Sequence, residues 1–194
     1  MDIKTSLFEG EWVHLTPIDP EQDAQVESKW THNPRYLRML YSEPARPLSP
    51  AQVKKKYEAI EKEAEEGKNL FHFAIRTRTE QNQERLIGFA QLFWIDWTNS
   101  SGVVRLGIGN PDDWGRGYGS DSLRLLLRYA FAELNLFGLM AFIPEYNQVA
   151  LRLFQRAGFI EEVRRREALN RDGRYWDMIH VGILRDQWIA HAQT

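Results

Sequence analysis

The chain has 194 residues, which is enough for one domain with a sizeable core, because a domain of this size buries roughly 70% of its unfolded surface. It has no cysteine, which excludes disulfides, thiolate metal ligands and a cysteine nucleophile, and which suits a reducing cytoplasm. The 25 Lys and Arg residues nearly balance the 27 Asp and Glu residues, and no long block of like charge occurs. This balance argues against a dedicated nucleic-acid-binding or membrane-surface protein.

The first elements are a strand and two helices. Rings and aliphatic residues alternate with polar ones over 11–15, which predicts a strand, and 21–30 is expected to be a helix that ends at Asn33-Pro34. Three prolines in 43–50 indicate a surface loop. The next helix is predicted to begin with Ser49 as N-cap, Pro50 at its first position and Gln52 three residues after the cap, and to end at Gly67 in the C′ position.

The remainder of the chain alternates strands with two amphipathic helices. Its hydrophobic periodicity predicts strands over 71–76, 86–94, 103–108, 139–143, 159–169 and 174–184, and helices over 120–134 and 149–157. The first two strands are expected to pair across the polar loop 77–85. Asp172-Gly173 is a strong hairpin signal between the last two. These features predict one mixed α/β or α+β domain over residues 1–194, and no basic leader or run of 18 apolar residues indicates export or a membrane span.

The residues between the third strand and the long helix, 112–120, read Asp-Asp-Trp-Gly-Arg-Gly-Tyr-Gly-Ser. Glycines at alternate positions let a ligand approach the backbone, and successive N–H groups at a helix N-terminus suit phosphate oxygens. A pyrophosphate site is therefore expected, although a merely tight connection would also use such glycines. The segment has neither the Gly-Lys-Ser/Thr of a P-loop nor the G-x-G-x-x-G spacing of a dinucleotide fold.

A second motif follows in 147–159, where Asn147-Gln148-Val149-Ala150 leads through Phe154 to Ala157-Gly158-Phe159. The two motifs in this order resemble those of the GNAT acetyltransferase superfamily, and with the Glu-Trp-Val-His-Leu-Thr-Pro-Ile start and the Asp-Gly-Arg-Tyr-Trp-Asp segment the chain looks like its RimJ/RimL-like branch. The resemblance implies a splayed mixed sheet of six to seven strands with about four helices. It also implies a cytoplasmic acyltransferase that moves acetyl from acetyl-CoA to a primary amine of a protein N-terminus, amino acid, polyamine or aminoglycoside, and a homodimer is consistent with it.

The resemblance assigns the cofactor-binding residues in three groups. Backbone groups for the pantetheine arm and the acetyl carbonyl are expected from Leu106, Gly107 and Ile108. Amides that hold the pyrophosphate are expected from Gly115, Arg116, Gly117, Tyr118, Gly119 and Ser120, with Arg152 and Arg156 as further cations near the phosphates. The far wall of the cofactor site is expected from Asn147, Ala150 and Phe154, and segments 94–97 and 44–50 are expected to flank the acceptor cleft.

The catalytic assignment departs from the family pattern at two places. Phe154 stands where many members have a tyrosine that protonates the departing thiolate, although a thiol with a pKa of about 8.5 leaves readily without a dedicated acid. Tyr118, Tyr146 or Tyr175 could replace that tyrosine, but each is expected to have a packing or loop role. Arg105 lies near the position where some relatives carry a glutamate base, so Glu145 is the preferred general base, with Asn147 beside it in the catalytic centre. A weak base favours an acceptor of low pKa, such as an α-amine. An acyl-CoA-binding domain without turnover and transfer of a longer acyl group stay open, and the spacing of the five histidines indicates no metal site.

Overall fold

A computed structural model describes residues 6–78 and 84–191, so the middle of the predicted loop 77–85 and both ends of the predicted domain 1–194 lie outside the described residues. Seven strands form one sheet in the order β1-β2-β3-β4-β5-β7-β6. β4 and β5 are parallel, and all other neighbours are antiparallel. This architecture confirms the predicted mixed α/β fold and its seven strands. The strands are β1 (Val13–Thr16), β2 (Phe71–Thr77), β3 (Leu86–Asp96), β4 (Ser101–Ile108), β5 (Gly138–Pro144), β6 (Ile160–Arg171) and β7 (Arg174–Leu184).

Six α-helices occur in the described residues, against about four expected. They are α1 (Gln22–Thr31), α2 (Pro34–Leu40), α3 (Pro50–Gly67), α4 (Tyr118–Arg128), α5 (Gln148–Arg156) and α6 (Arg185–His191). A short 3-10 turn, Pro111–Asp113, precedes α4, and a π-helical segment, Tyr129–Glu133, continues it. The predicted helix over 120–134 is therefore an α-helix with a π-helical end.

The sequence pattern did not predict two of these helices, α2 and α6, because their local signals are ambiguous. The side chain of Asn33 accepts a hydrogen bond from the Arg35 N–H at 3.0 Å, and Pro34 takes the first helical position, so the pair that closes α1 also starts α2. The short helix α6 directly follows β7, and no spacer residue marks the change.

The predicted start of α3 is confirmed. The Ser49 hydroxyl accepts a hydrogen bond from the Gln52 N–H at 3.3 Å, and the Gln52 side chain accepts one from the Ser49 N–H at 2.9 Å. The end of this helix differs by one residue from the prediction. Gly67 is still helical, and Lys68 takes the left-handed conformation with φ 49°.

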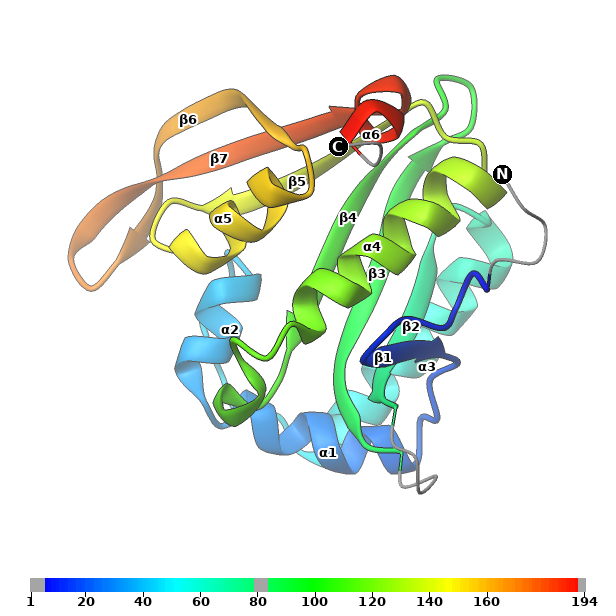
Figure 1. Cartoon of the computed structure of the whole chain (residues 1–194). Coiled ribbons are helices and arrows are strands. Elements are labelled where there is room, and N and C mark those ends of the chain that lie inside the picture. Colours follow the sequence, from blue (N-terminus) through cyan, green and yellow to red (C-terminus); the bar gives the residue numbers. More distant parts are fainter. Residues whose placement is uncertain (1–5, 79–83, 192–194) are drawn as a thin grey trace.

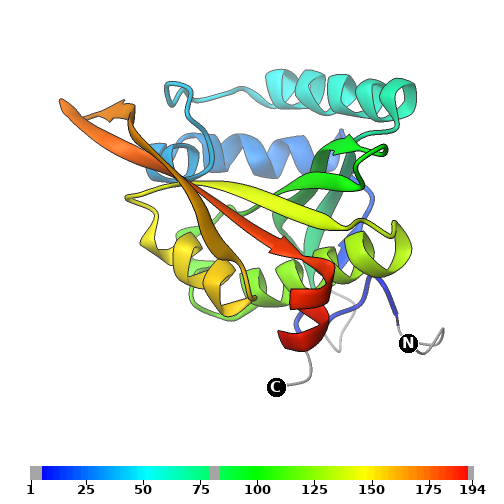
Figure 2. The same ribbon diagram turned by 90° about the horizontal axis from the view of Figure 1, so that it is seen from above.

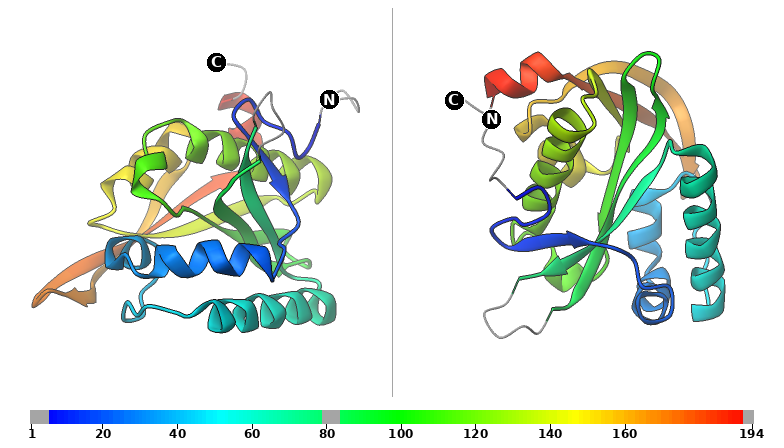
Figure 3. Two further views of the ribbon diagram at one scale, coloured as in Figure 1. Left: turned by 90° about the horizontal axis from the view of Figure 1, so that it is seen from below. Right: turned by 90° about the vertical axis from the view of Figure 1, so that its right-hand side faces the viewer.

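The sheet lies between two helical layers (Figures 2 and 3). α4 and α5 cover one face, where Leu123, Leu126 and Phe154 join the main core cluster. α1 and α3 cover the other face, where Trp30 of α1 clusters with Phe89 of β3, and Ile60 of α3 with Phe93. Each face of the sheet therefore has its own apolar core.

The β6–β7 hairpin projects beyond the rest of the sheet (Figure 1). Its turn contains Asp172 and Gly173, both at positive φ, at 53° and 72°, which confirms the predicted hairpin turn. In the described residues no helix is both long and apolar enough to cross a membrane.

Candidate functional site

The sheet opens between β4 and β5. These parallel strands are paired only from Ser101↔Gly138 to Val103↔Met140, and beyond Val103 they diverge toward α2 (Figure 1). β5 remains paired with β7 over its whole length, and β4 with β3. The divergence therefore leaves a gap in the middle of the sheet, where strand edges can bind a ligand through backbone groups.

A cavity of about 440 Å³ occupies this gap. Its wall includes Val104 and Phe154 from the core beneath α4 and α5, and Phe93 and Val103 from the apolar cluster on the α3 side. Side chains from both faces of the sheet therefore meet in one cavity. The complete lining is Met39, Leu40, Tyr41, Ser42, Glu43, Phe93, Trp94, Val103, Val104, Arg105, Leu106, Ala141, Phe142, Ile143, Pro144, Asn147, Ala150, Phe154, Arg165, Met178 and His180.

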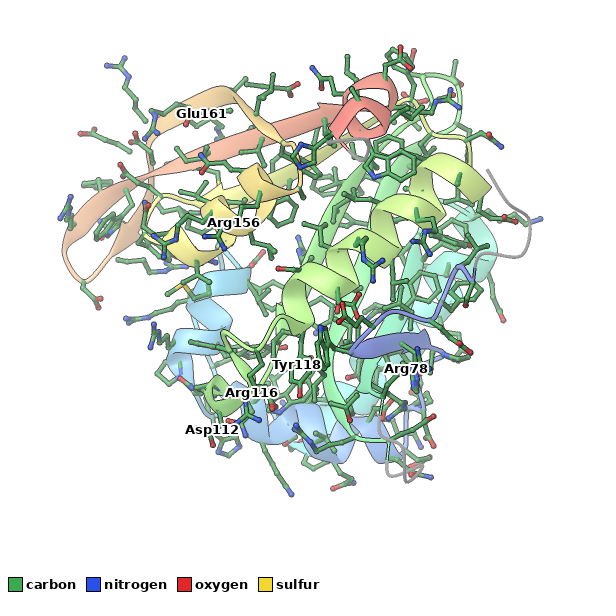
Figure 4. All side chains as sticks on the ribbon, in the orientation of Figure 1. Arg78, Asp112, Arg116, Tyr118, Arg156 and Glu161 are labelled. Atoms are coloured by element: carbon green, nitrogen blue, oxygen red, sulfur yellow. The ribbon has the colours of Figure 1, made fainter. Side chains whose placement is uncertain are left out.

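The glycine loop forms the beginning of α4. Gly115 and Gly117 have φ of 77° and 86°, a conformation that favours glycine, and Gly117 is the N-cap. The backbone N–H groups of residues 115–120 donate to no acceptor among the described residues, and the first hydrogen bond of the helix is that of Asp121 N–H to the Gly117 carbonyl. Six adjacent free donors at the positive end of a helix dipole are the arrangement that suits an anion. Arg116 and Tyr118 lie in this segment (Figure 4).

Two contacts hold the glycine loop against the sheet. The Trp114 indole donates to the Ile108 carbonyl at 2.8 Å, and Arg85 donates two hydrogen bonds, of 2.7 and 2.8 Å, to the buried Asp113 carboxylate. Trp114 thus links the loop to the end of β4. It also occupies the carbonyl of Ile108.

The predicted cofactor-binding residues divide into two places in the structure. Leu106, Asn147, Ala150 and Phe154 line the cavity. The glycine loop lies at the start of α4, and its Ser120 lines a second pocket of about 260 Å³ between α4, α5 and α6, which also contains Arg156. Gly107 and Ile108 are outside both linings. A Cβ added at Gly107 would lie 2.8 Å from Leu40 Cδ1, so this glycine allows the close approach of α2 to β4.

The side chain of Asn147 has a positioning role in this structure. Its Oδ1 accepts a hydrogen bond from the Ala150 N–H, and its Nδ2 donates to the Met39 carbonyl, both at 3.1 Å. Asn147 therefore caps α5 and ties it to the end of α2. The oxygen and the nitrogen of its side-chain amide are therefore both hydrogen-bonded to backbone groups at the edge of the cavity.

The structure does not bring Glu145 to the cavity. The carboxylate lies 3.4 Å from the Arg164 guanidinium and accepts a hydrogen bond from the Asp177 N–H at 3.3 Å. Arg164 also pairs with Glu161 and Asp177, at 3.0 and 3.1 Å. Glu145 thus belongs to an ionic cluster on the β5–β7–β6 side, and it is absent from the described cavity lining.

Sequence reasoning missed the residues of the cavity mouth. Residues 39–43, which are the end of α2 and the three residues after it, line it, whereas the predicted flanking loop 44–50 does not. Of the predicted aromatic segment 94–97, Trp94 lines the cavity, but the Trp97 indole donates to the Lys68 carbonyl elsewhere. Arg165 from β6 and His180 from β7 complete the wall. His180 has no signal beyond its position on the predicted hairpin. Arg165 belongs to the triplet Arg164-Arg165-Arg166, for which the sequence allows either a partly solvated position or a contribution to an acidic acceptor site.

A buried network of hydrogen bonds lies behind Tyr41, one of the residues that line the cavity. The Lys56 ammonium donates to the Tyr41 hydroxyl at 3.2 Å and to the Glu27 carboxylate at 2.9 Å, and Tyr57 donates to the other oxygen of Glu27. Burial alone would lower the pKa of Lys56, but Tyr41 and Glu27 raise it above its usual value. Lys56 therefore stays charged and its charge is balanced by Glu27, which is 2% exposed.

His180 lies beside Phe142, with ring centroids 4.6 Å apart. Burial and the nearby Arg165 charge lower the pKa of His180, so it is neutral at pH 7. No group of three or more potential metal ligands occurs among the residues that the structure describes.

Comparisons with known proteins agree with this geometry. A protein-family model described as an acetyltransferase (GNAT) domain matches residues 13–160. The spermidine N(1)-acetyltransferase of Vibrio cholerae is 28% identical over 114 residues, which are 59% of this chain and 65% of that protein, just under two thirds of its length. The Escherichia coli K12 spermidine N(1)-acetyltransferase is 22% identical over 183 residues, which cover 94% of this chain and 91% of that protein. The crystal structure of a Vibrio cholerae spermidine N-acetyltransferase with CoA and spermine has a TM-score of 0.77 at 21% identity, and the match covers 91% of this chain and 98% of that chain.

Proposed function

Because the chain belongs to the GNAT acetyltransferase family, and is thus an N-acetyltransferase that uses acetyl-CoA, we propose that it transfers acetyl directly to a primary amine while both substrates are bound. The observation that carries this proposal is the gap between β4 and β5, whose cavity is lined from both faces of the sheet. A thioester from the α4–α5 side and an amine from the α1–α3 side would meet there. Holding both reactants in one place supplies much of the rate enhancement.

The sites for acetyl-CoA are part of the proposal. The amides of Gly115 to Ser120 would bind its pyrophosphate, since they have no other acceptor among the described residues. Leu106, Ala150 and Phe154 would form the wall around the pantetheine and acetyl groups. A backbone N–H of the free β4 edge, at Leu106 or Ile108, would stabilise the oxyanion of the tetrahedral intermediate, whereas Gly107 faces β3 and pairs with Phe89. One such donor contributes about 3 kcal/mol in other acyl transfers.

Proton transfer requires a donor for the thiolate, and Phe154 has no proton to give. Tyr41 lines the cavity, and its hydroxyl accepts a hydrogen bond from Lys56, which can only donate. The hydroxyl proton of Tyr41 is therefore available for the leaving thiolate. We assign Tyr41 as the proton donor.

The role of Glu145 stays a prediction. Its pairing with Arg164 outside the cavity favours a structural role. The substitution Glu145→Gln distinguishes a general base from a structural residue. If Glu145 is the general base, the substitution should lower the rate and change its pH profile. If Glu145 is structural, the substitution should alter stability alone.

The acceptor is proposed as a small-molecule or peptide amine. Polyamines are the first class to test, because two relatives are named spermidine N(1)-acetyltransferases. Protein N-termini, amino acids and aminoglycosides are the other classes. Placement in the RimJ/RimL-like branch, a homodimer and a cytoplasmic location remain predictions.

Release of the CoA thiol, measured with acetyl-CoA and a panel of these amines, tests the proposed function. Steady release with at least one amine is expected. If CoA binds by calorimetry while no amine on the panel causes its release, direct transfer to an amine would be contradicted.

A further inference from the structure

The charged side chains of the cavity indicate the kind of acceptor. Its lining contains two arginines, Arg105 and Arg165, against one carboxylate, Glu43. We infer that the acceptor bears a carboxylate close to its primary amine, as in an amino acid or the acidic N-terminal residue of a peptide, and that Arg105 and Arg165 bind this carboxylate. The inference rests on the proposed function and names its substrate class.

Neither arginine has an ion-pair partner among the described residues. Other arginines of the chain are neutralised by carboxylates, as in Arg76 with Asp23, Arg85 with Asp113 and Arg164 with Asp177. In the cavity the guanidinium donors of Arg105 and Arg165 are thus available to a ligand. Arginine binds carboxylates through two parallel hydrogen bonds, which fixes both position and orientation.

Arg105 is held in place by aromatic rings. Its guanidinium carbon lies 4.5 Å from the centroid of Phe93 and 5.3 Å from that of Tyr41. Contact between the planar group and ring faces leaves the N–H edge free to bind an anion. The same rings restrict the rotamers of Arg105, so little side-chain entropy is lost when a ligand binds.

The neighbouring titratable groups do not offset this positive charge. His180 is neutral at pH 7, and the Lys56 charge behind Tyr41 is balanced by Glu27. Of the described groups at the cavity only Glu43 is anionic. A polyamine with several ammonium groups would face two guanidinium groups and one carboxylate, whereas an amine with its own carboxylate would complement them.

Two pairs of acceptors that differ by one carboxylate against one carboxamide test the inference, each compared at a pH above the pKa of both amines so that the fraction of neutral amine is equal. One pair is a free amino acid and its carboxamide, the other is a short peptide that begins with Asp and the same peptide with Asn, and spermidine is the polycation. We expect the charged member of at least one pair to have a kcat/KM about 10-fold or more above its neutral partner and above spermidine. The favoured pair then identifies the source as amino acid or peptide.

Variants of the two arginines give the second readout. Arg165→Gln or Arg105→Gln should raise KM for the charged acceptor about 10-fold and leave KM for its neutral partner unchanged. Arg166→Gln removes the same charge from the next residue of β6, which does not line the cavity, and should change neither value.

Three outcomes are informative. Preference for spermidine, or for the neutral member of both pairs, overturns the inference while the proposed function stands. An equal effect of Arg165→Gln on both members of a pair also overturns it, since a merely structural arginine acts on both alike. CoA binding without turnover of any acceptor would instead contradict the proposed function.

Discussion

The hydroxyl of Tyr41 donates to no described residue, although it lies in the cavity wall and accepts a hydrogen bond from Lys56. Replacement of Tyr41 by Phe keeps the ring that contacts Arg105 and removes only this proton donor. We expect Tyr41→Phe to lower kcat by about 100-fold and to leave the Kd of CoA unchanged. The control Tyr175→Phe removes an exposed hydroxyl of β7 and should keep full activity. An unchanged kcat for Tyr41→Phe would exclude it as the proton donor.

Substitution of Gly117 tests the proposed pyrophosphate site. Valine at φ 86° strains the backbone by about 1–3 kcal/mol and places a side chain beside the unpaired amides, so Gly117→Val should abolish CoA binding in calorimetry. Gly173 has a similar φ of 72°, in the hairpin turn, where an added Cβ has no neighbour within 4 Å. Gly173→Val therefore reproduces the strain alone, and it should lower stability while retaining CoA affinity. Retained affinity in Gly117→Val would refute the assignment of the glycine loop.

Among the elements, α4 is fixed to β1 by the Asp121 carboxylate. It accepts hydrogen bonds from the Trp12 and Val13 N–H groups at 2.7 and 3.1 Å, and it pairs with Arg124. Burial alone would raise the pKa of Asp121, but the hydrogen bonds from the Trp12 backbone and Arg124 lower it overall. The ionised carboxylate therefore stabilises the fold above the unfolded pKa of about 3.9, and this contribution is lost as the pH falls through the lower folded value.

Substitution of Asp121 tests this linkage. Asp121→Asn should lower the free energy of unfolding by about 1–3 kcal/mol at pH 7, as measured by urea denaturation. The difference from the unsubstituted protein should shrink below about pH 4, where the carboxylate becomes protonated. Asp112→Asn, at an exposed position before α4, is the control and should have little effect. A difference that does not change with pH would show that the charge of Asp121 is unimportant.

The tip of the β6–β7 hairpin is joined to the segment after α2. Arg171 donates to the carbonyls of Ser42 and Glu43, and Arg38 pairs with Asp172 at 3.1 Å. These contacts hold the mouth of the cavity, so Arg171→Ala should raise the acceptor KM about 3- to 10-fold with little change in the Kd of CoA. Arg185→Ala, at the start of α6, is the control and should leave the acceptor KM unchanged. A larger loss of CoA affinity than of acceptor binding would contradict this role of the hairpin.

An element could be predicted from the sequence where the residues that define it lie close together in the chain. The capping residues of α3 and the Asp-Gly turn of the hairpin act within a few residues, and the structure confirms both. α2 could not be predicted, because the pair Asn33-Pro34 is a signal for the end of one helix and also begins the next. The π-helical end of α4 and the left-handed Lys68 depend on packing and were not visible in the hydrophobic pattern.

At the scale of the whole molecule, sequence motifs indicated the proposed cofactor side of the cavity better than the proposed acceptor side. Leu106, Ala150 and Phe154 belong to contiguous motifs and do line it. Tyr41, Arg165 and His180 come from segments far apart in the chain that only the tertiary fold brings together. Arg165 belongs to the triplet Arg164-Arg165-Arg166, and strand alternation alone does not show which of these arginines faces the cavity.

The gap in the sheet has a kinetic consequence. Since its lining comes from both faces, the thioester and the amine would approach from opposite sides, and neither would block the path of the other. No compulsory order of addition is then imposed, and initial-velocity plots at several fixed concentrations of each substrate should give intersecting lines. CoA should compete with acetyl-CoA alone, and the acetylated product with the amine alone.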